Sequence, residues 1–460
     1  MDRPEDRIQE LCASLGIEPT YYDIWGDERN VPIETLRVIL NLISGEIERV
    51  EAQGCRIGST LLPDLTVNSL LLKEGDKLFF QILSGHPLEG EVEWLLETES
   101  GNYMEGSLRA SELNQKEASY PWKHYLTNVS ISRDLEYGYH FIHLKYKGKH
   151  IRKLLINAPT TCYVPEWLLS ERKVYGINLQ LYSLRSQTNL GIGEFGDLRS
   201  LGEGLKGSCL TILGMSPLNA LFPHDPKMIS PYSPCSRLFL NPLYLGIGDL
   251  LQLGKEAEAQ VRHMMGPLKG DGDDHPELVR YEEIWAFKKG LFEALYEDFK
   301  ASHLHNGTPL SQEFLVYQKE RGELLRYFST FLALNEMFLK EKGYYSWHQW
   351  PMAFRDPFSD DVKGWAEKNP DRLQYYQFLF WMTERAFRET KGQLNRLGKL
   401  LYLDFPVGVN GSGFEPWYYK DLFVCGISIG APPDEFNPKG QDWGFPPLNP
   451  MALRASDFKP

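Results

Sequence analysis

Three strand-like runs separated by helical stretches constrain the fold of the carboxy-terminal part of this chain most strongly. The runs fall at 174–183, 209–215 and 398–407 of the 460 residues. Strands that alternate with helices are typical of an α/β layer with parallel strands. Between the second and third runs lies a mostly helical stretch, about 245–395, that is rich in Trp, Tyr and Phe. A connection this long predicts a helical insertion, not a loop.

The residues ahead of this layer divide into three parts. Residues 1–55 predict a small helical unit, because Ile8, Leu11, Cys12 and Leu15 fall on one helical face and Pro32 opens a second apolar pattern. Residues 56–157 contain short alternating runs separated by turn residues, which is typical of a β-sandwich. Residues 158–173 contain two prolines without periodicity and predict a linker to a last domain, 174–460.

Charge and hydropathy exclude several classes of partner. The 49 basic residues are outnumbered by 62 acidic ones, and no window gathers enough Lys or Arg to neutralise a row of phosphates, so we expect no nucleic acid partner. No apolar run is long enough to span a membrane, and the charged start is not followed by the apolar region of a secretory signal. We therefore expect a cytoplasmic protein. The six cysteines show no zinc-ligand spacing, so we expect buried thiols and no metal.

A glycine-rich segment offers a competing function. Gly191-Ile-Gly-Glu-Phe-Gly196 matches the dinucleotide-binding pattern between a strand and a helix. A nicotinamide oxidoreductase would also need an acidic residue at the end of the second strand, and nothing between Glu203 and Asp225 is acidic. An acidic turn at 271–275 resembles a calcium loop, but Pro276 stands where that loop needs Gly. We expect neither cofactor nor metal.

Two proline-rich segments carry the strongest functional signal. They are Ser230-Pro-Tyr-Ser-Pro-Cys-Ser-Arg-Leu-Phe-Leu-Asn-Pro-Leu-Tyr244 and Gly430-Ala-Pro-Pro-Asp-Glu-Phe-Asn-Pro-Lys-Gly-Gln-Asp-Trp-Gly444. Their prolines stiffen the backbone next to hydroxyl, amide and aromatic groups at the ends of predicted strands. Sugars need this mixture, because aromatic rings cover their C–H faces and polar groups bind their hydroxyls.

These segments resemble the amylomaltase family of 4-alpha-glucanotransferases. The run that begins at Leu179 and ends at Leu198, the run 217–226 and the ending 446–454 continue the match. The resemblance covers nearly the whole chain, because bacterial members with an amino-terminal extension carry a helical unit and a β-sandwich before a (β/α)8 barrel. It implies an incomplete TIM-type barrel with a helical insertion, alpha-1,4-glucans and maltooligosaccharides as substrates, and no cofactor.

The resemblance also implies roles for five residues. Ser230 and Tyr232 would lie in the first barrel loops, with the tyrosine ring against the sugar at the cleavage point. Asp434, Gln441 and Trp443 would belong to a loop that folds over the bound glucan. The alternative interpretation is that Tyr232 and Trp443 are packing aromatics and that Asp434 caps a turn.

The catalytic carboxylates that the resemblance implies are not found within these 460 residues. The family uses a retaining double displacement with an Asp nucleophile in Arg-x-Asp-His and an acid/base Glu in Gly-Glu-Asp-Leu, and neither motif occurs here. Asp404 stands at the end of the predicted third strand, outside such a motif, so we expect it to be structural or at most a contact at the rim. Three strands cannot close a barrel of eight. The sequence thus predicts a truncated enzyme that is inactive alone, with a separate carboxy-terminal fragment as a candidate partner, or else a non-catalytic glucan-binding protein.

Overall fold

The computed structural model describes residues 8–9, 11–13, 15, 17–44, 65–69, 71–74, 77–118, 124–131, 135–169, 173–253, 259 and 278–458. The acidic turn at 271–275 lies outside these residues. Contacts divide the chain into two compact units. The first contains residues 1–165, 421–442 and 447–460, and the second contains residues 166–420 and 443–446.

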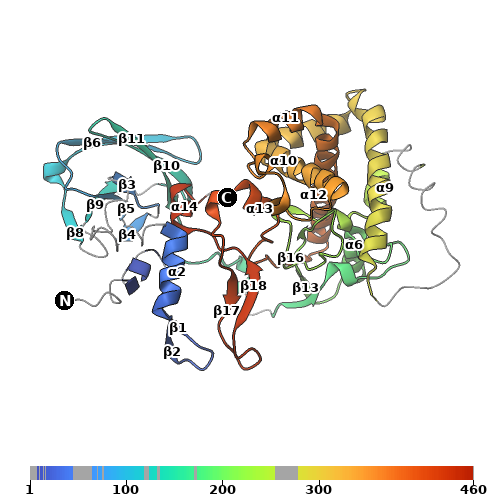
Figure 1. Ribbon diagram of the computed structural model, residues 1–460, viewed down its shortest axis with the longest axis horizontal. Coiled ribbons are helices and arrows are strands. Elements are labelled where there is room, and N and C mark those ends of the chain that lie inside the picture. Colours follow the sequence, from blue (N-terminus) through green and yellow to red (C-terminus); the bar gives the residue numbers. More distant parts are fainter. Residues whose placement is uncertain are drawn as a thin grey trace. The chain divides into compact units, whose positions relative to one another are not determined.

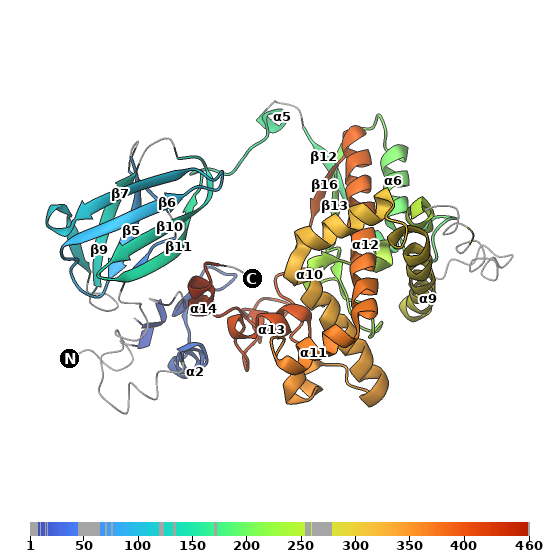
Figure 2. The same cartoon turned by 90° about the horizontal axis from the view of Figure 1, so that it is seen from above.

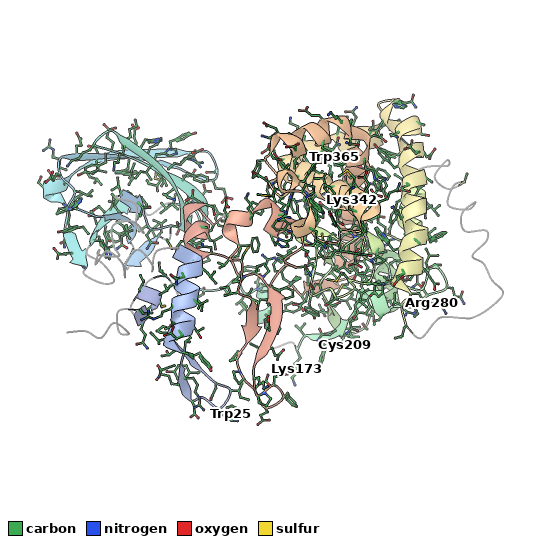
Figure 3. The ribbon with its side chains drawn as sticks, in the orientation of Figure 1. Trp25, Lys173, Cys209, Arg280, Lys342 and Trp365 are labelled. Atoms are coloured by element: carbon green, nitrogen blue, oxygen red, sulfur yellow. The ribbon has the colours of Figure 1, made fainter. Side chains whose placement is uncertain are left out.

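The first unit begins with a small apolar cluster and a hairpin. Strands β1 (Thr20–Tyr22) and β2 (Glu28–Asn30) pair ahead of helix α2 (Ile33–Ser44). The sequence predicted helix throughout this region, but Asp23 Oδ1 accepts hydrogen bonds from the amides of Trp25 and Asp27, at 3.0 and 2.9 Å, and so closes a turn. Trp25 is labelled at this turn in Figure 3.

Two antiparallel sheets follow among the described residues of the first unit (Figure 2). One has the order β11-β10-β6-β7, and the other has the order β3-β5-β9-β8 with β4 also paired to β5. Phe80, Ile82 and Val129 of one sheet share a buried core with Val92 and Ile142 of the other, as alternation along each strand requires. The strand bounds are β3 Leu65–Val67, β4 Leu72–Glu74, β5 Lys77–Ser84, β6 Glu91–Glu97, β7 Tyr103–Arg109, β8 Gln115–Ala118, β9 His124–Ile131, β10 Gly138–Tyr146 and β11 Lys149–Asn157, with the short helix η1 at Ala110–Glu112.

The end of the chain returns to this first unit. Helix α14 (Pro450–Ala455) contacts α2, and the side-chain amide of Asn449 donates to the carbonyl of Ile43 at 3.1 Å. Lys153 Nζ lies 3.3 Å from Asp457 Oδ1. The sequence predicts a single domain from residue 174 onward, whereas residues 421–442 and 447–460 belong to the first unit. Local sequence patterns cannot predict these contacts, because the contacts join residues about 300 to 400 positions apart.

The second unit is organised by a three-stranded parallel sheet of order β12-β13-β16. These strands, Tyr175–Leu179, Leu210–Met215 and Leu400–Leu403, confirm the three predicted runs. Helices α6 (Phe195–Gly204) and α12 (Pro370–Arg396) lie side by side and pack near the sheet. The other short elements are α5 Glu166–Leu169, η2 Leu181–Ser183, β14 Asn219–Ala220, β15 Ser236–Leu240, η3 Pro242–Tyr244, α7 Ile247–Leu250, η4 Leu251–Leu253, α13 Phe414–Tyr418 and η9 Lys420–Leu422.

The insertion between β15 and β16 is helical, as predicted (Figure 1). Thr308 Oγ1 accepts from the amide of Ser311 where α10 begins, and Gly343 ends that helix in the left-handed conformation. Gly322 interrupts α10 with a positive φ of 54°, a kink that the sequence pattern did not predict. Figure 3 labels Arg280 ahead of α9 and Trp365 on α11. The helix bounds are α9 Tyr281–Phe299, η6 Lys300–Leu304, α10 Pro309–Lys342, η7 Trp347–Gln349, η8 Met352–Phe354 and α11 Asp360–Lys368.

Candidate functional site

Tyr232 and Asp404 meet at the carboxyl edge of the parallel sheet. Tyr232 lies in the loop between β14 and β15, and its hydroxyl donates to Asp404 Oδ2 at 2.9 Å. Asp404 directly follows β16, and its amide donates to the carbonyl of Met215 at the end of β13. The hydrogen bond to this carboxylate raises the pKa of Tyr232. Ligands of open α/β sheets bind outside the carboxyl ends of the strands, so this pair lies where a site is expected.

The tyrosine ring is open to solvent. Tyr232 is 51% exposed, and Ser230 and Asp404 are exposed as well. An exposed ring next to a hydroxyl and a carboxylate presents one apolar surface and two kinds of hydrogen-bonding group. This arrangement can bind a polyhydroxylated ligand, because the ring can stack on C–H groups while the oxygen atoms bind hydroxyls.

The carboxy-terminal end of this loop is fixed by residues that follow β16. The side-chain amide of Asn410 donates to Ser233 Oγ at 3.0 Å. Glu415 Oε1 accepts from the amide of Arg237 at 2.6 Å and from Ser236 Oγ at 3.3 Å. Glu415 is buried, and burial raises its pKa to about 7. The loop therefore rests on a buried carboxyl group that titrates near neutral pH.

The glycine-rich segment has a role in the packing of the second unit. A Cβ at Gly193 would collide with the carbonyl oxygen of Leu181. Glu194 caps α6 and receives a hydrogen bond of 2.6 Å from Lys288 Nζ, and both side chains are buried. Gly193 and Glu194 of this pattern thus have structural roles in the second unit.

Asp434, Gln441 and Trp443 belong to a second proline-rich segment, around β17 (Ile429–Ala431) and β18 (Gln441–Phe445). Asp434 Oδ1 accepts from the amides of Phe436 and Asn437 at 2.8 and 2.6 Å, and the Asn437 hydrogen bond leads the effects that lower its pKa. Asp434 thus caps a turn, as the alternative interpretation predicted.

The other two residues of this segment keep exposed surface. Gln441 is exposed and its side chain also contacts Asp434, while Trp443 is 39% exposed. A Cβ at Gly430 would collide with the Gln441 carbonyl, which explains the glycine in this motif.

The structure joins the predicted site residues in two groups. Tyr232 and Ser230 lie in one loop of the second unit. Asp434 contacts Gln441 in the first unit. Trp443 belongs, with residues 443–446, to the second unit. Sequence reasoning missed the contact of Asp404 with Tyr232. The signal was its place directly after an apolar run that ends at the same edge as 209–215.

The described residues contain neither a candidate metal site nor a candidate membrane-spanning helix. In that part of the chain no three His, Cys, Asp or Glu side chains form a group that could hold a metal ion. No helix there is both long and apolar enough to cross a membrane. Cys12 and Cys235 are buried as predicted, but Cys162, Cys209 and Cys425 are exposed, which corrects the expectation of buried thiols.

Comparisons with known sequences point to one family. A family model described as 4-alpha-glucanotransferase matches residues 179–460. The chain is 31% identical over 350 residues to the 4-alpha-glucanotransferase of Haemophilus influenzae, an alignment that covers 73% of this chain and 49% of that protein. It is 27% identical over 476 residues to the 4-alpha-glucanotransferase of Mycobacterium tuberculosis strain H37Rv, covering 98% and 62%. The chain thus spans about half to three-fifths of the length of these relatives.

Solved structures show a related fold. The amylomaltase from Corynebacterium glutamicum matches with a TM-score of 0.73 at 22% identity, over 98% of this chain and 62% of that chain. The amylomaltase from Streptococcus agalactiae in complex with acarbose matches with a TM-score of 0.52 at 20% identity, over 63% and 55%. At these identities the likeness concerns the fold alone.

Proposed function

We propose that this chain, which belongs to the 4-alpha-glucanotransferase family, binds alpha-1,4-glucans and maltooligosaccharides at the carboxyl edge of its parallel sheet. The observation that carries this proposal is the contact between Tyr232 and Asp404, which holds an exposed aromatic ring beside two oxygen-bearing groups. The family match covers the residues on both sides of this contact. A cytoplasmic location stays a prediction from the sequence.

The five predicted residues have distinct roles in this proposal. Tyr232 stacks on a sugar ring beside the bond to be cleaved, and Ser230 binds a hydroxyl in the same loop. Gln441 and Trp443 contact neighbouring sugars. Because Asp434 caps the turn between β17 and β18, we assign it the positioning of Gln441 within that segment.

The proposed reaction is glucan transfer by a retaining double displacement. A carboxylate attacks the anomeric carbon, a second carboxyl group protonates the leaving oxygen, and the 4-hydroxyl of another glucan then takes the place of water. Neither the Arg-x-Asp-His nor the Gly-Glu-Asp-Leu motif occurs in residues 1–460. We therefore propose that a polypeptide of these residues alone binds glucan without transferring it, and that further polypeptide supplies the two carboxylates.

One edge of the parallel sheet supports the proposal that further polypeptide is required. Among the described residues, β16 is hydrogen-bonded to β13 and forms one end of the sheet. Its side chains Leu400, Tyr402 and Leu403 are 36%, 70% and 44% exposed. An exposed apolar edge strand is a template for another strand. We propose that a fourth parallel strand, in the same or a separate chain, adds to β16.

A titration of maltoheptaose into the 460-residue protein tests the binding role. We expect saturable heat for the unmodified protein, and a loss of affinity of about tenfold or more for Tyr232→Ala, since aromatic anchors dominate such contacts. Tyr345→Ala serves as the control because Tyr345 is a similarly exposed tyrosine, at 56%, in the helical insertion. Equal affinities for the two variants would refute the assignment of this site.

A non-catalytic glucan-binding protein is the second candidate function. The absence of both catalytic motifs from residues 1–460 favours it. The two functions differ in one outcome. If the chain is part of an enzyme, adding a polypeptide that contains both motifs should produce glucan transfer. If it is not, the mixture should bind glucan without transferring it.

A further inference from the structure

The amino-terminal end of the Tyr232 loop is held by the helical insertion. His224 Nε2 lies 2.8 Å from the hydroxyl of Tyr376, which belongs to α12. The same hydroxyl donates to Glu336 Oε2 of α10 at 2.9 Å. A phenol has one proton, and here it points to Glu336. The tyrosine oxygen thus joins His224 to Glu336.

The carboxylate at the far end of this chain of hydrogen bonds is fixed by cations from two helices. Arg372 donates to both oxygens of Glu336 at 2.7 Å, and Lys289 Nζ of α9 lies 2.9 Å from Oε1. Although burial opposes ionisation, the hydrogen bonds from Arg372 contribute to lowering the pKa of Glu336 to about 2. Glu336 is thus a permanent acceptor for Tyr376, and the network joins α9, α10 and α12 to the loop.

Apolar contacts also hold this part of the loop, because Met228 packs against the buried core of the second unit. Met228 and Ile229 line a pocket together with Tyr281 and Trp285 of α9. Between His224 and Tyr232 the backbone follows consecutive turns, in which the amide of Met228 donates to Asp225 and that of Ser233 donates to Ser230. We expect a shift at His224 to pass along these turns toward Tyr232.

We infer that Tyr376 is a positioning residue for the glucan-binding loop, because its hydrogen bond to His224 fixes the end of the loop that Asn410 and Glu415 do not reach. This inference rests on the proposed glucan-binding function of Tyr232. Tyr376 itself is 1% exposed and does not contact the ligand. The insertion thereby acts as a support for the binding site in addition to its own aromatic core.

A matched pair of variants separates positioning from general stability. Tyr376→Phe removes the hydroxyl that joins His224 to Glu336. Tyr317→Phe removes an equivalent buried hydrogen bond between the same two helices, since Tyr317 of α10 donates to Glu384 of α12 at 3.0 Å. Both changes should lower the unfolding temperature of the 460-residue protein to a similar extent.

Hydrogen exchange measured without glucan tests the inference directly. We expect the amides of Met228 and Ser233 to exchange faster in Tyr376→Phe and at the unmodified rate in Tyr317→Phe. The double variant His224→Ala/Tyr376→Phe should exchange no faster than His224→Ala, because without the imidazole the tyrosine hydroxyl has lost its contact with the loop. Equal exchange in the two tyrosine variants would overturn the inference.

Maltoheptaose affinity then links the loop to its function. Tyr376→Phe should weaken binding by about tenfold, as a misplaced contact group does, and Tyr317→Phe by less than about twofold. If the unmodified protein does not bind maltoheptaose, the proposed function fails, while the exchange experiment still decides whether Tyr376 positions the loop. If binding is weakened equally by both variants, the role of Tyr376 is only structural.

Discussion

The ring and the hydroxyl of Tyr232 have separate roles that substitutions can distinguish. Tyr232→Phe keeps the ring and removes the hydrogen bond to Asp404. Because both side chains are exposed, we expect a change in unfolding free energy of less than about 0.5 kcal/mol. Calorimetric titration with maltoheptaose should show weaker binding than the unmodified protein and stronger binding than Tyr232→Ala. An affinity equal to that of Tyr232→Ala would contradict a stacking role for the ring.

Glu415 should make stability depend on pH. Its pKa is raised from 4.5 to about 7 in the folded protein, so the folded state holds more protons than the unfolded state between these values. The contribution of Glu415 to the free energy of unfolding is fully present below pH 4.5. It falls by roughly 1–3 kcal/mol as the pH rises to about 7. Glu415→Gln still accepts from Arg237 and cannot ionise. Urea unfolding from pH 4.5 to 8 should show a shallower decline for this variant. The remaining slope belongs in part to Glu194, whose pKa burial also raises to about 7.

Individual side chains were predictable where a motif named them, and less so where the fold paired them. The sequence identified Tyr232 as a candidate, but its partner Asp404 is 172 positions away. His224 and Tyr376 carry no local signal, because their contact depends on how α12 packs against the loop. Asp434 could be interpreted as a turn cap from sequence because an Asp among prolines commonly accepts from amides that follow it.

At the scale of elements, the β17–β18 hairpin depends on Gly430. Gly430→Ala would place a Cβ against the Gln441 carbonyl, so we expect the strands to separate locally and Trp443 to change its environment. Tryptophan fluorescence and limited proteolysis of residues 429–445 would report this. Gly364→Ala is the control, because a Cβ there meets open space within α11 and should stabilise the helix by about 0.5–1 kcal/mol. Unchanged proteolysis of the hairpin in Gly430→Ala would contradict the packing described.

The buried ion pair between α9 and the start of α6 should be costly to break. Lys288 Nζ contacts Glu194 Oε1 at 2.6 Å and the carbonyls of Leu243 and Leu245 at 2.6 and 2.8 Å. Lys288→Met should lower the free energy of unfolding by about 3–5 kcal/mol, because it leaves a buried carboxylate unpaired. Adding Glu194→Gln should recover part of the loss in denaturant titrations. A single variant as stable as the unmodified protein would show that the pair contributes nothing.

Sequence periodicity predicted the type of each helix and strand more accurately than where each one begins and ends. Three parallel strands and a helical insertion were predicted from alternation and length. The hairpin β1–β2 was missed because it depends on a turn closed by Asp23 and on a positive φ of 83° at Gly26. Turn chemistry of this kind competes with an apolar pattern that otherwise indicates helix.

At the scale of the whole molecule, the chain end belongs to the unit in which the chain begins. Met451 packs against the cluster that contains Leu36 and Leu40, and Asn449 contacts Ile43. Sequence patterns indicate which segments form helices or strands, but contacts between segments this distant depend on complementary surfaces that only the folded chain presents. Among the described residues, the buried apolar side chains gather in three separate clusters.

The central claim is that residues 1–460 bind alpha-1,4-glucan and need further polypeptide to transfer it. The most direct test begins with the calorimetric titration, which establishes the maltoheptaose concentration that saturates the protein. The 460-residue protein is then incubated with maltoheptaose at that concentration, and the oligosaccharides are separated by length by chromatography. We expect maltoheptaose to be bound and recovered unchanged, with transfer appearing only when a polypeptide with both catalytic motifs is added. Shorter and longer maltooligosaccharides formed by the 460-residue protein alone would contradict the claim.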